Sequence, residues 1–88
     1  MPKFIDHHTM PTMSPEKQVA MMKQIKTAIE SGKPDKFGVT MLNVFTAPGE
    51  AWGYSEAPNA EAIVKSHEAL GVSMSIKDVV KVTPLVNS

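Results

Sequence analysis

The stretch that decides the fold of this 88-residue chain is FGVTMLNVFTAPGEAWGYSE, residues 37–56. Its first half, residues 37–46, is rich in β-branched and apolar side chains and predicts a long strand. Ala47-Pro48-Gly49-Glu50 has the composition of a turn, so residues 51–56 should return antiparallel to that strand. The centre of the chain is therefore predicted to be a β-hairpin.

The segment before the hairpin predicts a helix with clear ends. Ser14 has the character of an N-cap, Pro15 suits the first helical position, and Ser31-Gly32 ends the helix. Apolar residues at a spacing of three and four predict one buried stripe along it. The stripe consists of Met22, Ile25 and Ile29, with Met21 and Ala28 beside them.

Three further elements complete the chain. Residues 3–8 form a short extended run at the start. After the hairpin, a second helix begins at Pro58 or Asn59 and runs through Leu70. A last strand covers approximately residues 78–83.

This order of elements, β-α-β-β-α-β, predicts an α+β fold of the ferredoxin-like kind as one domain over residues 1–88. The fold has a four-stranded antiparallel sheet with two helices on one face. We place the first and third strands side by side at its centre and expect them to be parallel, so that their C-terminal ends lie together.

Both faces of the long strand are apolar. Val39, Met41 and Phe45 are expected on one face, and Leu42 and Val44 on the other. Two helices can cover only one face of the sheet, and a small chain gains stability by burying the other face against a second copy. We therefore predict a homodimer with facing sheets, a dimeric α+β barrel. The alternative is a monomer that tolerates a few exposed apolar residues.

The composition argues against several classes of function. Nine lysines balance nine aspartates and glutamates, and this zero net charge argues against nucleic acid or an anionic membrane as the main partner. The chain has no cysteine, which removes disulfides, thiolate metal sites and thiol nucleophiles. No apolar run approaches the ~20 residues of a membrane span. The first residues lack the apolar core of a signal peptide, so we expect a cytoplasmic protein.

Asp6-His7-His8 is a dense cluster of side chains that bind metals. Residues two apart on a strand point the same way, so Asp6 and His8 present a carboxylate and an imidazole together. His7 points away unless the strand ends or bulges near the loop that contains Pro11. Parallel first and third strands would also bring Glu56 near His8. Such a set of nitrogen and oxygen ligands suits nickel, cobalt or zinc. The alternative is a strand end whose polar groups are satisfied by hydrogen bonds.

His67 shares the buried stripe of the second helix with Ile63 and Leu70. A lone histidine on an apolar face is more often a hydrogen-bonded core residue than a ligand. It lies about 13 Å along the helix from Pro58, at 1.5 Å per residue. His8 is expected at a different level, near the end of its strand. We therefore do not expect these two histidines to share one ion within a subunit, and a second site is the alternative.

Methionines offer a softer chemistry. Thioethers bind copper(I), and Met10, Met13, Met21 and Met22 lie close together in one third of the chain. Methionine is also the adaptable filler of cores and interfaces. For Met21 and Met22, which lie on the helix stripe, packing is the simpler interpretation.

Three segments carry a resemblance to a known family. They are Phe4-Ile5-Asp6-His7-His8, the run SEAPNAEA at residues 55–62, and His67 followed by Gly71. Over nearly the whole chain the sequence resembles small bacterial nickel-binding proteins otherwise classed as a domain of unknown function. The resemblance implies a ferredoxin-like fold, a homodimer and nickel-binding sites.

Two functions are compatible with these residues. The first is a non-enzymatic protein that binds nickel, or another divalent transition metal, for sequestration or sensing, with ligands drawn from Asp6, His7, His8, Glu56 and His67. The second is a dimeric-barrel enzyme or small-molecule-binding protein. There, His7 or His8 would act as an acid or base in an apolar pocket with Trp52 and Tyr54. A metal needs several convergent ligands, whereas the pocket needs one titratable group facing a cavity.

Overall fold

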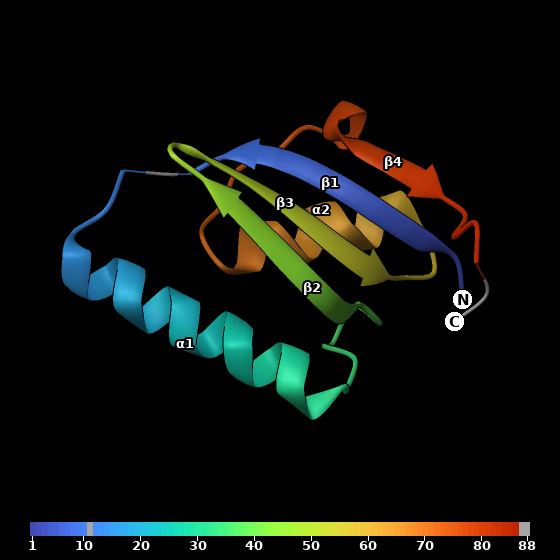
Figure 1. Cartoon of the computed structure of the whole chain (residues 1–88), viewed down its shortest axis with the longest axis horizontal. Helices are drawn as coiled ribbons and strands as arrows, with labels where there is room; N and C mark the ends of the chain where they lie inside the picture. The colour runs from blue at the N-terminus through green and yellow to red at the C-terminus, as the bar shows by residue number, and fades with distance from the viewer. Residues whose placement is uncertain (11, 87–88) are drawn as a thin grey trace.

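The computed structural model describes residues 1–10 and 12–86, and Pro11 of the first loop therefore lies outside the described residues. The elements follow the predicted order β-α-β-β-α-β (Figure 1). They are β1 (Lys3–Thr9), α1 (Pro15–Ser31), β2 (Thr40–Ala47), β3 (Glu50–Glu56), α2 (Ala60–Ala69), the 3-10 turn η1 (Ile76–Asp78) and β4 (Val79–Val82). The predicted ferredoxin-like α+β fold is confirmed.

The helix ends form as the local sequence predicts. The Ser14 hydroxyl accepts a hydrogen bond from the backbone N–H of Lys17, and Gly32 ends α1 in the left-handed conformation, with φ of 64°. The Asn59 side chain caps α2 by accepting from the backbone N–H of Ala62 at 2.9 Å. Each cap satisfies a backbone group that the helix itself leaves unpaired.

The sheet has the strand order β2-β3-β1-β4, and each neighbouring pair is antiparallel. Lys3 lies opposite Glu56, and Thr9 lies opposite Glu50, so the prediction that β1 and β3 are parallel is wrong. After β1, helix α1 leads the chain back across the sheet, so that β2 runs in the same direction as β1. The hairpin then reverses it, and β3, which lies between these two strands, runs opposite to both.

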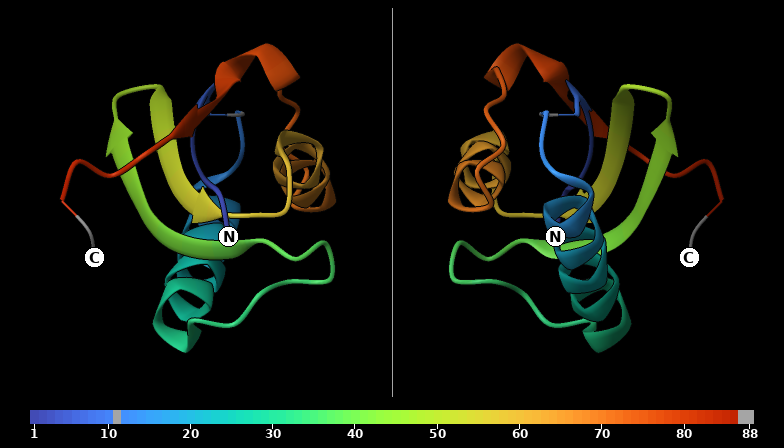
Figure 2. Two further views of the ribbon diagram at one scale, coloured as in Figure 1. Left: turned by 90° about the vertical axis from the view of Figure 1, so that its right-hand side faces the viewer. Right: turned by 90° about the vertical axis from the view of Figure 1, so that its left-hand side faces the viewer.

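Side chains alternate between the two faces of the sheet. We call the face toward the two helices the inner face and the opposite one the outer face (Figure 2). Phe4 on the inner face packs with Val39, Ala57, Ala62 and Ile63 to form the core. The core therefore lies between β1 and the face of α2 that also carries His67.

A bulge in β2 changes which residues face outward. The register shifts between Met41 and Asn43, and Leu42 is the extra residue. Met41 lies opposite Ser55 on the inner face, whereas Phe45 is on the outer face and is 57% exposed. The prediction that Met41 and Phe45 share a face is therefore wrong, because the bulge shifts the alternation by one residue.

Helix α1 covers the sheet less closely than α2 does. It packs against the edge strand β2, and none of its residues is buried. In the predicted stripe, Met22 is 43% exposed, and the other members are half-buried. Because α1 lies at the edge of the sheet, space remains between it, α2 and the inner face.

Candidate metal centre

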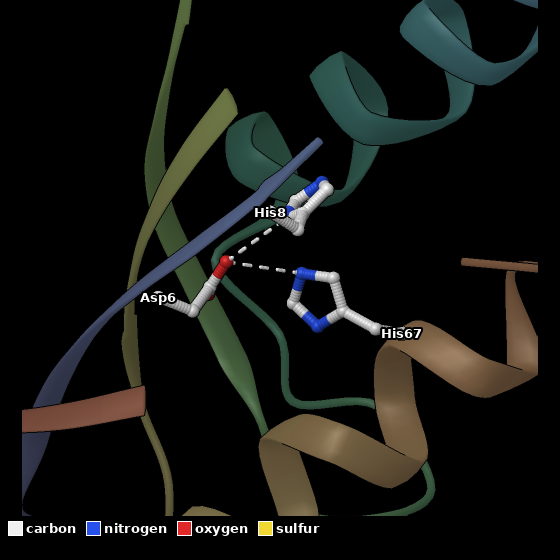
Figure 3. Close-up of side chains that lie close together, drawn as sticks. All are labelled: Asp6, His8 and His67. Atoms are coloured by element: carbon white, nitrogen blue, oxygen red, sulfur yellow. Dashed lines mark hydrogen bonds and ion pairs between the residues drawn. The ribbon is translucent and has the colours of Figure 1, made fainter. Parts of the chain in front are cut away.

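Asp6, His8 and His67 converge on the inner side of the sheet (Figure 3). Each offers one ligand atom, and these atoms all lie within 4.8 Å of one another. Asp6 and His8 come from alternate positions of β1, as predicted for residues two apart on a strand. His67 comes from the facing side of α2.

His8 and His67 lie at the same level of the fold, with ring centroids 5.0 Å apart. The expectation that they lie too far apart for one ion is therefore wrong. Because β3 ends beside Lys3, α2 starts near the beginning of β1 and runs in the direction of β1 (Figure 1). His8 lies about 16 Å along its strand from Lys3, at ~3.3 Å per residue. This nearly equals the ~13 Å that separates His67 from the start of the helix.

Asp6 is the centre of the cluster and has 0% exposure. His8 Nδ1 and His67 Nε2 each lie 3.3 Å from its Oδ1 atom, whereas Oδ2 has no hydrogen-bond partner. Burial by itself would raise the pKa of Asp6, but the hydrogen bonds and charges of the two histidines outweigh it. The net effect holds the pKa of this carboxyl well below its ordinary value, so Asp6 is ionised.

The space for the Asp6 carboxylate comes from Gly53, which lies opposite it on β3. A Cβ atom at position 53 would lie 2.5 Å from Oδ2 of Asp6. The buried oxygen without a partner thus occupies volume that any other residue would fill. An ionised oxygen in such a place needs a cation or a proton donor to offset its desolvation.

The orientation of the His67 ring is set by a second contact. Its Nδ1 atom lies 2.8 Å from the carbonyl oxygen of Ile63. A carbonyl can only accept, so Nδ1 carries the hydrogen and Nε2 faces Asp6. Burial alone would lower the pKa of His67, but its contacts with Asp6 and Ile63 raise it above 6.5. Nε2 therefore faces Asp6 with a proton below this pKa and with a free lone pair above it, and the lone pair could bind a metal ion.

A clamp beside the centre holds α2 against the loop before β2. Asp35 Oδ1 accepts from the backbone N–H groups of Phe37 and Val39, at 2.9 and 3.0 Å. Its Oδ2 atom accepts from the hydroxyl of Ser66, the residue just before His67. This carboxylate helps position the helix that presents His67 to the cluster.

Two of the predicted ligands lie elsewhere. His7 is on the outer face, where its Nε2 atom pairs with Glu50 Oε1 at 2.9 Å and its ring lies 5.1 Å from that of Trp52. Glu56 is also on the outer face, at the opposite end of β1, and its Oε1 atom lies 3.7 Å from Lys3 Nζ. The predicted proximity of Glu56 to His8 is wrong, because it depended on parallel strands.

A small cavity adjoins the cluster and has a volume of about 40 Å³. Its walls are mostly apolar and include the thioethers Met10, Met21, Met22 and Met41. Sequence reasoning missed Met41 and Gly53 as parts of the site. The alternation of small residues at Ala51, Gly53 and Ser55 was the available signal, because it predicts open space on one face of a strand.

Comparison with known proteins adds one similar structure. No protein-family model and no curated protein matches this chain. No helix of the described residues is long and apolar enough to cross a membrane. The chain is similar to SCO4226 from Streptomyces coelicolor A3(2), which is known from a crystal structure, with a TM-score of 0.65 and 26% sequence identity. The similarity covers 97% of this chain and 99% of that one, so the two share this α+β fold over nearly their whole length.

Proposed function

We propose that this protein binds one divalent transition-metal ion per chain through Asp6, His8 and His67, and that the ion is nickel, held for sequestration or sensing. The proposal rests on the convergence of one buried carboxylate and two imidazoles, whose ligand atoms lie within 4.8 Å of one another. The buried Oδ2 atom of Asp6 has no hydrogen-bond partner at the same place. A bound cation would satisfy that oxygen.

The surroundings of His67 support a ligand role. Histidines that bind metals usually donate their other ring N–H to a carbonyl or carboxylate, which fixes the tautomer and directs the free nitrogen to the ion. The bond from Nδ1 to the Ile63 carbonyl has this form. His67 is thus both a hydrogen-bonded residue of the buried face and a candidate ligand.

The donor set supports a borderline divalent metal. Two imidazoles and one carboxylate suit nickel, cobalt, zinc or iron, whereas calcium and magnesium favour sites made of oxygen alone. Nickel exceeds cobalt and iron in the general order of affinity for such ligands. The resemblance to nickel-binding proteins points to the same ion.

The number of converging groups favours metal binding over the acid–base alternative. His8 faces a cavity together with two further ligands, rather than as a single titratable group. His7 lies on the open outer face and pairs with Glu50. Trp52 and Tyr54 lie along a shallow groove of that outer face, away from the cluster.

Nickel titration calorimetry of protein purified without a histidine tag tests this function. We expect one nickel per chain in the wild type, and at least a tenfold loss of affinity in His8→Ala and in His67→Ala. His7→Ala and Glu56→Gln are matched controls that remove a predicted ligand outside the cluster, and they should bind as the wild type does. Unchanged binding in a His8→Ala/His67→Ala double variant would overturn the proposal.

We also propose that the outer face is covered by a second copy of the chain in a homodimer. Ile5, Phe45 and Val80 on this face are 40%, 57% and 57% exposed. Ile5 and Phe45 border the groove with Trp52 and Tyr54. Burying such a face would stabilise a chain of this size, because its own core is small.

A further inference from the structure

We infer that a metal ion at Asp6, His8 and His67 keeps open coordination positions on the side of the cavity, and that these positions take a small, weakly hydrated ligand of two or three non-hydrogen atoms, such as azide. The inference rests on the proposed function and names what the bound metal can bind in turn.

The protein supplies too few ligands to fill the coordination sphere of a bound metal ion. The cluster supplies three ligand atoms, one from each residue. Borderline divalent metals take four to six, and a set of two histidines and one carboxylate typically leaves neighbouring positions open on one side of the ion. Asp6, His8 and His67 all line the cavity, so the side left open faces it.

The cavity wall is chemically suited to a weakly hydrated ligand. Apart from the cluster, the lining is aliphatic and thioether in character, with only the hydroxyls of Thr46 and Ser55 as polar side-chain groups. No lysine and no further carboxylate contributes to it among the described residues. Phosphate and sulfate would lose their hydration there without compensation, whereas a weakly hydrated ligand would lose little.

The size of the cavity limits which ligands can enter it. The cavity measures about 40 Å³, and one water requires ~10–15 Å³ by the same kind of measure. The space therefore holds two or three water-sized atoms beside the metal. Organic molecules of drug size need pockets of ~300–1,000 Å³ and would not fit.

The open side can be blocked at one residue. Val44 lines the cavity opposite Gly53, whereas Phe45, the next residue, faces outward. A Val44→Trp variant would fill the cavity without changing a metal ligand. Phe45→Trp is the matched control, because it places the same side chain one residue away on the other face.

Cobalt(II) is the probe, because its visible absorption reports the number and geometry of its ligands. Sodium azide is titrated into the cobalt-loaded protein, and we expect a saturable change in the visible bands. Val44→Trp should retain cobalt and lose at least tenfold in azide affinity, while Phe45→Trp should respond as the wild type does. Cobalt binding is measured by calorimetry in each variant.

A second measurement on the wild type does not depend on the folding of Val44→Trp. Benzohydroxamate, a larger metal-binding ligand, should produce no spectral change and should not displace azide. Equal binding of both ligands would overturn the size limit, and equal azide binding by Val44→Trp would overturn the placement in the cavity.

Different experimental results would overturn this inference alone or together with the proposed function. Wild-type protein that binds cobalt without responding to azide overturns this inference alone. Sulfur among the cobalt ligands in the X-ray absorption spectrum does the same, because a methionine would then occupy the open side. Protein that binds neither nickel nor cobalt overturns both the inference and the proposed function.

Discussion

Nε2 of His67 lies 3.3 Å from Oδ1 of Asp6, while Nδ1 of the same ring is held by the Ile63 carbonyl. Without metal, a proton on Nε2 turns this contact into a charge-assisted hydrogen bond between two buried groups. A metal ion bound by Nε2 would replace that proton. The same pair of atoms therefore links protonation, stability and metal binding.

The metal-free protein should lose stability as the pH rises through the neutral range. The pKa of His67 is raised above 6.5, so its contribution is fully present below 6.5 and is lost as the pH rises through the folded-state pKa. Urea unfolding in the presence of EDTA at pH 6 and pH 8.5 measures this loss. The His67→Gln variant should lack it, and an identical pH dependence in both proteins would contradict the assignment.

Asp6 acts in the opposite direction at acid pH. Its lowered pKa contributes stability that is present above the ordinary value of 3.8 and is lost as the pH falls through the folded-state pKa.

Nickel affinity should decrease from pH 8 to pH 6, because the ion competes with the proton of His67. Calorimetry with nickel at these two pH values measures the change, and an affinity independent of pH would refute the expectation.

Gly53→Ala should destabilise the protein and weaken nickel binding. Glycine to alanine in an extended strand ordinarily stabilises by about 0.4–1 kcal/mol. Here the new Cβ atom would lie 2.5 Å from Oδ2 of buried Asp6, so we expect a loss of about 1–3 kcal/mol in the free energy of unfolding. In an Asp6→Ala background the same substitution should cost less. Strict additivity of the two changes would show that the carboxylate does not fill this space.

Phe45→Lys should convert the proposed dimer into a monomer. The lysine would place an unpaired charge in the apolar interface, which costs several kcal/mol. Val19→Lys is the control, because Val19 on α1 is 56% exposed and Phe45 is 57% exposed. Sedimentation should report twice the chain mass for the wild type and for Val19→Lys. A monomeric wild type at micromolar concentration would exclude the dimer.

Asp35→Ala should lower stability while leaving one nickel per chain. The change removes an acceptor shared by Phe37, Val39 and Ser66, and we expect a loss of about 1–3 kcal/mol in the free energy of unfolding. Glu30→Ala removes an exposed carboxylate from α1 and should cost far less. Denaturant unfolding compares the two variants, and equal losses would show that the clamp contributes nothing.

Local signals predicted the elements well. The cap at Ser14, the start of the second helix next to Asn59 and the turn after Ala47 depend on a few neighbouring residues, and each forms where the sequence predicts it. The pairing of Asp6 with His8 on one face also follows from local alternation along a strand. These features need no knowledge of which distant segments meet.

Strand direction is a property of the whole chain, and one wrong assumption about it produced two errors at the site. Parallel β1 and β3 would have placed Glu56 beside His8 and the start of α2 far from Lys3. In the antiparallel sheet, Glu56 meets Lys3 instead, and α2 brings His67 up to His8. A single correction of direction thus removes Glu56 from the predicted ligands near His8 and brings His67, another predicted ligand, beside His8.

The bulge at Leu42 sets the phase of every later side chain in β2. If Leu42 instead entered the ladder opposite Tyr54, Val44 would turn outward, and Phe45 would turn inward opposite Ala51, toward the cavity. That regular register would fill the space beside Asp6, His8 and His67 and, in the same step, remove an aromatic ring from the outer face. The cavity on the inner face and the exposed ring of Phe45 on the outer face therefore depend on the same bulge. A change of register in β2 would alter both.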